Sequence, residues 1–372
     1  MSPDPNTAAA GLAATKPGTT RRLSIHSALS VISNAVLHHR WFVALVVLFV
    51  AAAVFVGLVT GNSNIVSIRI YSDSLVLLII PFILAAVLGH AIWMMIFVRP
   101  KGALAPALWA DFNRRFLQKE RIAGFLIVFL LVPLFFSAFS SFKRMIPYLN
   151  FWTLDPTFRD WDKFLHFGRH PWELTHAVLG TPLMTTGVNF FYHAWLFVMF
   201  FTLIWQAWNI KRPHLRMQYF VSFALMWIII GTAMAILLSS AGPVYFSNVT
   251  GVFNPYLPLM SRLYELHQTS PVWALDLQQT LWANYAAGST ALKSGITAMP
   301  SMHVAASVHM ALLGWSYNRW AGIGFTAFAI IIQIGSVHLG WHYAIDGYVS
   351  AVLVVLIWYG VGRVMRGSKR RS

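Results

Sequence analysis

Two short stretches of the sequence combine histidine with other polar side chains where long apolar segments begin. The first is MPSMH, residues 299–303, and the second is HYAID, residues 342–346. Residues four apart on a helix share one face, so His342 and Asp346 can touch. A carboxylate bonded to one imidazole nitrogen fixes the tautomer and leaves the other nitrogen free as a nucleophile.

The spacing of the two histidines predicts that they meet. His303 and His342 are 39 positions apart, which is the length of two membrane crossings of about 17–20 residues each. Arg319 lies near the midpoint and marks a cytoplasmic turn, so both histidines lie at the non-cytoplasmic face. His303 then serves as a separate acid/base group, and Ser301 with the start of its helix favours an anion. Together these residues predict a phosphoryl-transfer site.

The composition predicts the elements that position these residues. The chain is 58% hydrophobic and 10% charged with a mean hydropathy of +0.63, which is typical of a polytopic, all-α membrane protein. A segment over 24–40 is predicted to be an amphipathic helix on the membrane surface. The eight predicted spans cover approximately residues 41–60, 74–98, 121–142, 188–209, 217–240, 301–317, 320–338 and 343–364.

Charge predicts the topology of this bundle. The net charge of +16 comes from clusters in alternate connections, which favours membrane orientation over nucleic-acid binding and places both termini in the cytoplasm. The long connections 143–187 and 241–300 fall on the opposite side and are expected to form a lid or binding vestibule. We divide the chain into a disordered tail (1–23), a peripheral part with two spans (24–120), a catalytic membrane domain (121–365) and a basic tail (366–372).

Two alternatives to phosphoryl transfer remain open from the residues alone. His303, His338, His342 and Asp346 could ligate zinc, but the sequence contains no HExxH and no cysteine. A transporter or scaffold without catalysis is the other alternative. The sequence shows no pair of interrupted helices at matching positions in two halves, the pattern that would favour a transporter.

The two motifs resemble those of a known family. PSMH followed by HYAID resembles the second and third signature motifs of the phosphatidic acid phosphatase type 2 superfamily. MPSMH and HYAIDG are similar to the branch with inositol phosphorylceramide synthases of the aureobasidin-resistance type, and sphingomyelin synthases share the His-Tyr-x-x-Asp form. GPVYF, residues 242–246, resembles a short Pro/aromatic motif of the synthases. The resemblance is specific over 299–347 and looser over about 150–300.

The resemblance implies roles for the three chemical residues. His342 would be the nucleophile that forms a phosphohistidine, Asp346 its orienting carboxylate, and His303 the acid that protonates the leaving group. It also implies a six-helix core, formed by spans three to eight, with its site at the outer membrane face. No metal ion or organic cofactor is implied.

The sequence departs from the superfamily pattern in its phosphate-binding arginines. The nearest match to the first motif runs from Lys163 to His170-Pro171, with histidine where arginine belongs, and lies far too early in the chain. Ser336 occupies the arginine position before the third motif. The candidates for meeting the phosphate charge in their place are Lys293, His338, Arg169, Lys163 and Arg262. The other residues predicted to bind the substrate are Ser301, Met302, Tyr343 and Tyr245.

These departures favour a phosphotransferase over a simple phosphatase. The expected reaction moves a phosphoryl headgroup from a phospholipid donor to an alcohol or lipid acceptor. With water as the acceptor, the same residues would make a lipid phosphatase acting on phosphatidate-like or isoprenoid phosphates. The expected partners are the bilayer and its lipids, without nucleic acid. The expected location is a bacterial inner membrane with the site facing the periplasm, or the lumen in a eukaryote.

Overall fold

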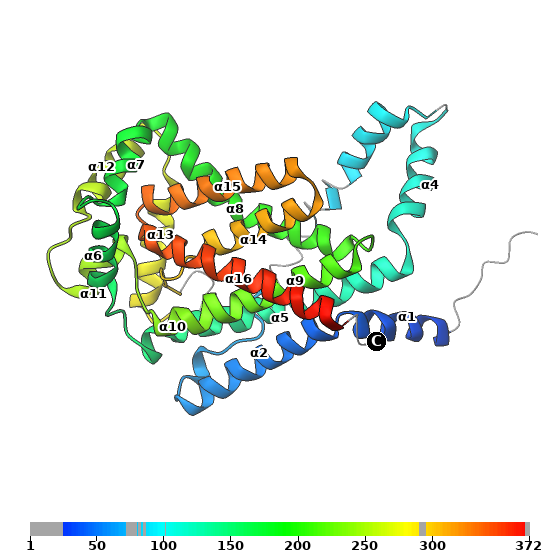
Figure 1. Cartoon of the computed structure of the whole chain (residues 1–372), viewed down its shortest axis with the longest axis horizontal. Coiled ribbons are helices and arrows are strands. Elements are labelled where there is room, and N and C mark those ends of the chain that lie inside the picture. The colour runs from blue at the N-terminus through cyan, green and yellow to red at the C-terminus, as the bar shows by residue number, and fades with distance from the viewer. Residues whose placement is uncertain are drawn as a thin grey trace, which may run out of the picture.

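The long helices of the protein lie alongside one another in a single bundle (Figure 1). The computed structural model describes residues 25–71, 80, 83–84, 87–100, 102–289 and 295–368, and this part of the chain contains helices but no strand. The bundle consists of α2 (Arg40–Val59), α5 (Lys119–Leu149), α8 (Pro182–Trp208), α9 (Pro213–Ile228), α14 (Met302–Tyr317), α15 (Arg319–His338) and α16 (Ala344–Ser368). The predicted fold class, an all-α membrane-type bundle, is confirmed.

Six helices in the described residues are long and apolar enough to cross a membrane. They are α2, α5, α8, the continuous stretch Pro213–Leu237 formed by α9, η3 (Ile229–Met234) and α10 (Ala235–Leu237), α15 and α16. The predicted span 301–317 falls on α14, which has only 16 residues. The predicted span 74–98 lies partly outside the described residues, and its described end is a helix over Val87–Val98 that finishes as η2 (Met94–Val98). The count of eight therefore stays a prediction.

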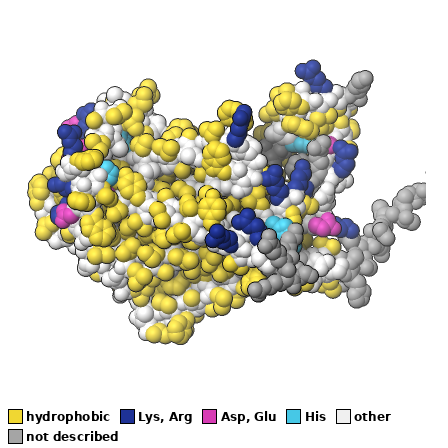
Figure 2. All heavy atoms as spheres, in the orientation of Figure 1, with side chains coloured by type: hydrophobic (Ala, Val, Ile, Leu, Met, Phe, Trp, Pro, Cys, Tyr) yellow, Lys and Arg dark blue, Asp and Glu magenta, His cyan; other side chains and the backbone are white. Residues whose placement is uncertain are grey.

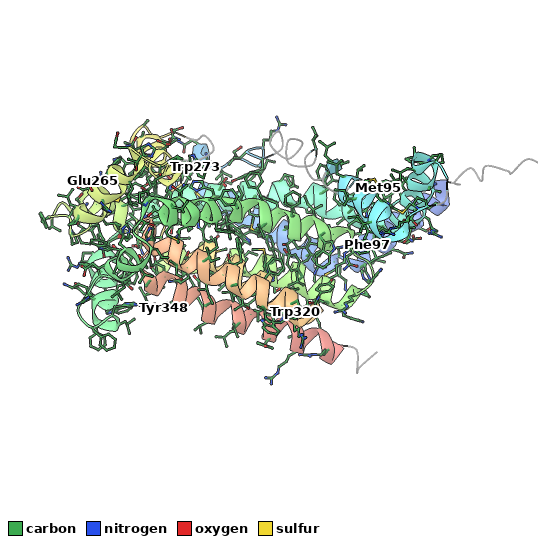
Figure 3. The ribbon with its side chains drawn as sticks, turned by 90° about the horizontal axis from the view of Figure 1, so that it is seen from above. Met95, Phe97, Glu265, Trp273, Trp320 and Tyr348 are labelled. Carbon is green, nitrogen blue, oxygen red and sulfur yellow. The ribbon has the colours of Figure 1, made fainter. Side chains whose placement is uncertain are left out.

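The two long connections fold into short helices gathered at one end of the bundle (Figure 1). We call this the cap end, and Figure 3 shows Glu265 and Trp273 there. Its helices are α6 (Asp155–Leu165), α7 (Pro171–Leu179), η4 (Pro243–Tyr245), α11 (Phe246–Thr250), α12 (Leu257–His267) and α13 (Trp273–Ala286).

The opposite end, which we call the basic end, carries Arg40, Arg121, Arg216 and Arg319. Helices α1 (Ile25–His38) and α4 (Leu104–Phe116) lie on this side (Figure 1). Figure 2 shows hydrophobic side chains covering the middle of the bundle, with Lys and Arg gathered towards its two ends. This distribution is the one expected of a bundle with its apolar belt in hydrocarbon.

Helix α14 turns back into α15 through a tight connection, as the histidine spacing predicts. Asn318 caps α15, because its side-chain oxygen accepts a hydrogen bond from the Ala321 N–H at 2.9 Å. Gly314 permits the close approach of the two helices: a Cβ there would lie 2.7 Å from the Ala321 carbonyl oxygen. The chain thus crosses the bundle twice between His303 and His342 and returns to the cap end.

Candidate active site

His342 and Asp346 form a buried pair at the cap end. His342 Nδ1 lies 3.1 Å from Asp346 Oδ2, and Asp346 is fully buried. The same carboxylate oxygen accepts a hydrogen bond from the Tyr343 N–H at 3.1 Å. The predicted i, i+4 contact is confirmed, and this arrangement orients the imidazole through Nδ1 and leaves Nε2 as its reactive nitrogen.

His303 faces this pair from α14. The ring centroids of His303 and His342 are 5.9 Å apart with an interplanar angle of 63°. Two aromatic rings of α8 hold His303 in place: Tyr192 stacks on it at 4.5 Å, and Trp195 lies at 4.3 Å. The prediction that spacing and parity bring both histidines to one face is therefore confirmed.

Lys143, which was not predicted from the sequence, lies near the two histidines. Lys143 acts electrostatically on both His303 and His342. Burial, with a further contribution from this ammonium, lowers the pKa of His342 to about 3. The imidazole is therefore neutral at pH 7, the form that a nucleophile requires.

Lys143 reaches the site because α5 is longer than its apolar run. The predicted span ends at 142, whereas the helix continues to Leu149. Gly295 makes room for the lysine, since a Cβ there would lie 2.8 Å from Lys143 Cγ. Lys143 and His303 both keep partial exposure, whereas His342 is only 6% exposed. Lys143 thus supplies a cation beside the two histidines, in a sequence that lacks the arginines of the superfamily motifs.

The backbone of the turn that presents His342 is tied to α15. The Ser336 carbonyl accepts hydrogen bonds from the N–H groups of Trp341 (3.0 Å) and His342 (3.1 Å). Ser336 is the position where the family pattern has arginine. Here it contributes its backbone, while its hydroxyl bonds to the Ile332 carbonyl at 2.9 Å within the helix.

The GPVYF motif packs directly against the same turn. The Val244 N–H donates to the Gly340 carbonyl at 3.0 Å. Gly242 has φ +95°, and a Cβ there would lie 2.6 Å from the Trp341 carbonyl oxygen, so glycine is required by both conformation and space. Gln278 of α13 donates to the Leu339 carbonyl at 2.9 Å. Segments far apart in the sequence therefore fix the position of His342.

Three residues predicted to contact substrate are instead committed to protein partners. The ring of His338 is fully buried, with Nε2 3.0 Å from Thr185 Oγ1 and Nδ1 3.3 Å from Thr175 Oγ1. The Tyr343 hydroxyl donates to Asp155 at 2.9 Å. The Tyr245 hydroxyl donates to the Gln278 carbonyl at 2.8 Å. These contacts indicate structural roles for His338, Tyr343 and Tyr245, and their predicted contact with substrate stays a prediction.

The remaining predicted contacts are distributed differently. Ser301 caps α14, with its hydroxyl accepting from the Val304 N–H at 3.5 Å and its own N–H donating to the Asp346 carbonyl at 3.1 Å. Met302 follows it and packs towards Gly231 of η3. The anion cradle predicted here stays a prediction.

The predicted cations lie in the cap-end loops. Arg169 is exposed, Lys163 is half-buried near the end of α6, and Arg262 pairs with Glu265 on the surface at 3.2 Å. No contact joins these three to His303 or His342 in the described part of the chain. Lys293 lies outside the described residues.

Two buried carboxylates near the turn that carries His342 were not predicted from the sequence. Asp155 and Asp162 of α6 are 0% and 2% exposed. Burial raises the pKa of both, that of Asp162 to about 7. The spacing of seven residues, two helical turns, is the sequence signal that they share a face.

A polar cavity of about 240 Å³ lies beside the cap end of α5. Arg144, the residue after Lys143, contributes to its wall and donates to the Ile65 carbonyl at 2.7 Å. The cavity is lined by Gly61, Asn62, Asn64, Ile65, Arg144, Tyr148, Tyr285, Gly288 and Ser289.

The described residues contain no group of three or more His, Asp or Glu side chains arranged to hold a metal ion. A family model described as the PAP2 superfamily matches residues 156–360, just over half of the chain. The match includes His303, His342 and Asp346. No curated protein and no solved structure matches the chain.

Proposed function

The chain belongs to the PAP2 superfamily, and from this premise we propose that it is an integral membrane phosphotransferase that works through a phosphohistidine. In our proposal it moves a phosphoryl headgroup from a phospholipid donor to an alcohol or lipid acceptor. The observation that carries the proposal is the oriented, neutral His342 facing His303, with Lys143 beside both.

The first half of the proposed reaction forms the covalent intermediate. Nε2 of His342 attacks the donor phosphorus and the bond from phosphorus to the leaving alkoxide breaks. His303, whose protonated form the negative charge of the bound phosphate favours, gives that oxygen its proton. Asp346 holds the Nδ1–H and stabilises the charge that develops on the ring. The 5.9 Å between the two rings suits a phosphoryl group attacked on one side and released on the other.

The second half regenerates the enzyme. His303, now neutral, takes the proton of the acceptor hydroxyl as its oxygen attacks phosphorus, and the bond from phosphorus to His342 breaks. Lys143 offsets the negative charge of the phosphoryl oxygens in both steps. Water in place of the alcohol would turn the same cycle into hydrolysis.

We favour transfer over hydrolysis because the cavity beside α5 offers a place for an alcohol. Its wall presents amide, hydroxyl and guanidinium groups from Asn62, Asn64, Ser289, Tyr148 and Arg144, which are groups that bind hydroxyls. Arg144 of its wall follows Lys143 in the chain, which places the cavity at the same end of α5 as Lys143.

A product assay tests the proposal. Purified protein in lipid nanodiscs is incubated with a phospholipid labelled in its headgroup phosphate, with and without an alcohol such as inositol. We expect label in a new phosphodiester only when the alcohol is present. Label released solely as a water-soluble phosphate, either the phosphorylated headgroup of a phosphodiester donor or free phosphate from a phosphomonoester donor, would identify hydrolysis. Turnover unchanged in His342→Ala would exclude this site altogether.

We also propose that the cap end faces away from the cytoplasm, because the basic end fits the positive-inside rule. The chain contains no cysteine, so Glu265→Cys provides one unique label site at the cap end. An impermeant maleimide should label it in intact cells. Labelling only after the membrane is opened would reverse the orientation.

A further inference from the structure

Resting on the proposed role of His342 as nucleophile, we propose that α6 is part of the active site. Its two buried carboxylates, Asp155 and Asp162, are positioning residues that hold the turn presenting His342. Neither residue contacts the reacting atoms in this proposal; each acts through the backbone or side chains of residues 340–346.

Asp162 holds the first turn of α16. Its Oδ2 accepts a hydrogen bond from the Ala344 N–H at 2.7 Å, and its Oδ1 accepts from the Ile345 N–H at 2.9 Å. Asp346 accepts from the preceding N–H, that of Tyr343. Three successive N–H groups at this helix start therefore bond to two carboxylates. The N–H groups at a helix start have no partner within the helix, so Asp162 supplies what the helix itself cannot.

Asp155 joins the other side of the turn to the GPVYF motif. Its Oδ1 accepts from the Tyr343 hydroxyl (2.9 Å), the Gly242 N–H (2.8 Å) and the Ser240 hydroxyl (3.0 Å). Its Oδ2 accepts from the Ala241 N–H at 2.9 Å. One carboxylate thus fixes the residue that follows His342 and the segment that packs against Trp341.

Helix α6 buries both acids together with Phe158, while two other aromatic side chains of the helix stay exposed. Asp155 and Asp162 lie inside, whereas Trp161 is 51% exposed and Phe164 is 83% exposed. Burial of a carboxylate is costly unless it is hydrogen-bonded, and the six donors around these two satisfy that need. We infer that the hydrogen bonds accepted by Asp155 and Asp162 determine which face of α6 is buried.

A second contact fixes the far end of α6 to α16. The ring of His166 lies with Nδ1 2.7 Å from the Asp162 carbonyl and Nε2 3.1 Å from the Tyr348 hydroxyl. Tyr348 is one turn beyond the capped start of α16, towards the cap end in Figure 3. Helix α6 therefore holds the start of α16 at two levels, and with it the register of Asp346 against His342.

Removing these bonds should slow chemistry more than it weakens substrate binding. A displacement of about 1 Å at a reacting group can cost about 100-fold in rate. We expect Asp162→Ala to lower kcat about 100-fold and Asp162→Asn, which keeps one acceptor oxygen, about 10-fold. KM should stay within about twofold in both variants, because neither substitution alters a side chain proposed to contact the phospholipid. Asp155→Asn should resemble Asp162→Asn.

Matched controls separate positioning from loss of folding. Asp160→Asn alters the same helix at an exposed site, where the side chain is 61% exposed and pairs with Arg159, and should keep wild-type kinetics. Gln206→Ala removes a fully buried polar side chain at the basic end and should lower Tm without lowering kcat. Tyr343→Phe deletes a single bond to Asp155 and should lower kcat a few-fold even if the alanine variant does not fold.

The outcomes distinguish this inference from the function on which it rests. Reduced kcat with unchanged KM in the α6 variants, graded from Asn to Ala, supports it. Wild-type kcat in folded Asp162→Ala, or losses no larger than those of Gln206→Ala at equal Tm, would overturn it. Absence of turnover in the wild-type protein itself would count against the proposed function instead.

Discussion

At each end of the bundle, a buried charged side chain bonds to the unpaired backbone groups of a helix terminus, with a carboxylate at the cap end and a guanidinium at the basic end. At the cap end, Asp162 accepts hydrogen bonds from the N–H groups that begin α16. At the basic end, Arg216 donates to the carbonyls of Gln206 (3.0 Å) and Ala207 (2.7 Å), which end α8. Both arrangements follow from the helix dipole and its unpaired terminal groups. Of these two helix ends, the one at the cap end also places an imidazole against a carboxylate, so a buried charge does not by itself mark a site.

The same contrast occurs within α14. His303 and His309 are both enclosed by aromatic rings, but His309 is 1% exposed and its Nε2 lies 2.8 Å from the Ser222 hydroxyl. Tyr219 stacks on it at 4.7 Å. His303 keeps partial exposure and faces a second histidine. The two histidines therefore differ in their surroundings: His309 has a buried hydroxyl partner, whereas His303 is partly exposed and faces His342.

The largest expected effect separates the two ends. His342→Ala should lower turnover by at least about 10⁴-fold, since the nucleophile is lost, with little change in Tm. Arg216→Ala should leave turnover nearly unchanged and lower the stability. It removes the hydrogen-bond donor of two buried carbonyls, which should cost about 1–3 kcal/mol. Assays of turnover and thermal unfolding on both variants check this. Equal loss of turnover in the two would remove the distinction between the ends.

The next effect compares the two histidines of α14. His303→Gln should slow the reaction by about 10²–10⁴-fold through loss of the acid/base group. His309→Gln should retain turnover while lowering Tm. A leaving group of low pKa, such as a nitrophenol, should restore much of the rate of His303→Gln, because it needs no proton. A failure of that rescue would contradict the role of His303 as acid.

Lys143 and its neighbour Arg144 offer a smaller, sharper contrast. Lys143→Ala should lower kcat/KM about 10–100-fold, the value of one charge-assisted hydrogen bond, and Lys143→Arg should recover part of the loss. Arg144→Lys should leave hydrolysis of a simple donor unchanged and reduce transfer to an alcohol. Kinetics with and without the alcohol test both, and a Lys143→Ala variant with wild-type kcat/KM would exclude the lysine from the site.

The smallest effect concerns pH. Because the folded pKa of His342 is about 3 against a usual value near 6.5, the unfolded chain binds one more proton between these values. His342 should therefore lower the free energy of unfolding as the pH falls below about 6.5, by up to about 1.4 kcal/mol per pH unit. Thermal unfolding at pH 7, 6 and 5 should show a shallower decline for His342→Gln. Parallel declines would show that His342 titrates normally.

The residues that could be predicted from the sequence are those governed by regular geometry. The helical rise and the alternation of membrane sides predicted that His303 and His342 meet. The i, i+4 spacing predicted the contact between His342 and Asp346. Lys143 could not be predicted in the same way, because its helix continues beyond the apolar run through Pro147. Local sequence also does not reveal that Asp162 reaches the N–H of Ala344, 182 positions further along the chain.

Polar residues at the same end of the bundle were the hardest to separate. His338 and Tyr245 lie near the site in sequence or by motif, and the structure shows their polar atoms hydrogen-bonded to a neighbouring hydroxyl and a neighbouring carbonyl. Such partners come from α7, α8 and α13, whose arrangement no local pattern encodes. The meeting of His303 and His342 could be predicted, whereas the contacts that hold the turn at His342 could not.

The central claim is that His342 carries the phosphoryl group. Wild-type protein and His303→Gln should be mixed with a phospholipid donor, quenched in alkali, in which phosphohistidine survives, and digested for mass spectrometry. We expect phosphate on His342 in both, accumulating further in the variant if deprotonation of the acceptor becomes limiting. Active wild-type protein with phosphate on another residue, or with none on His342 at the shortest times, would contradict the account.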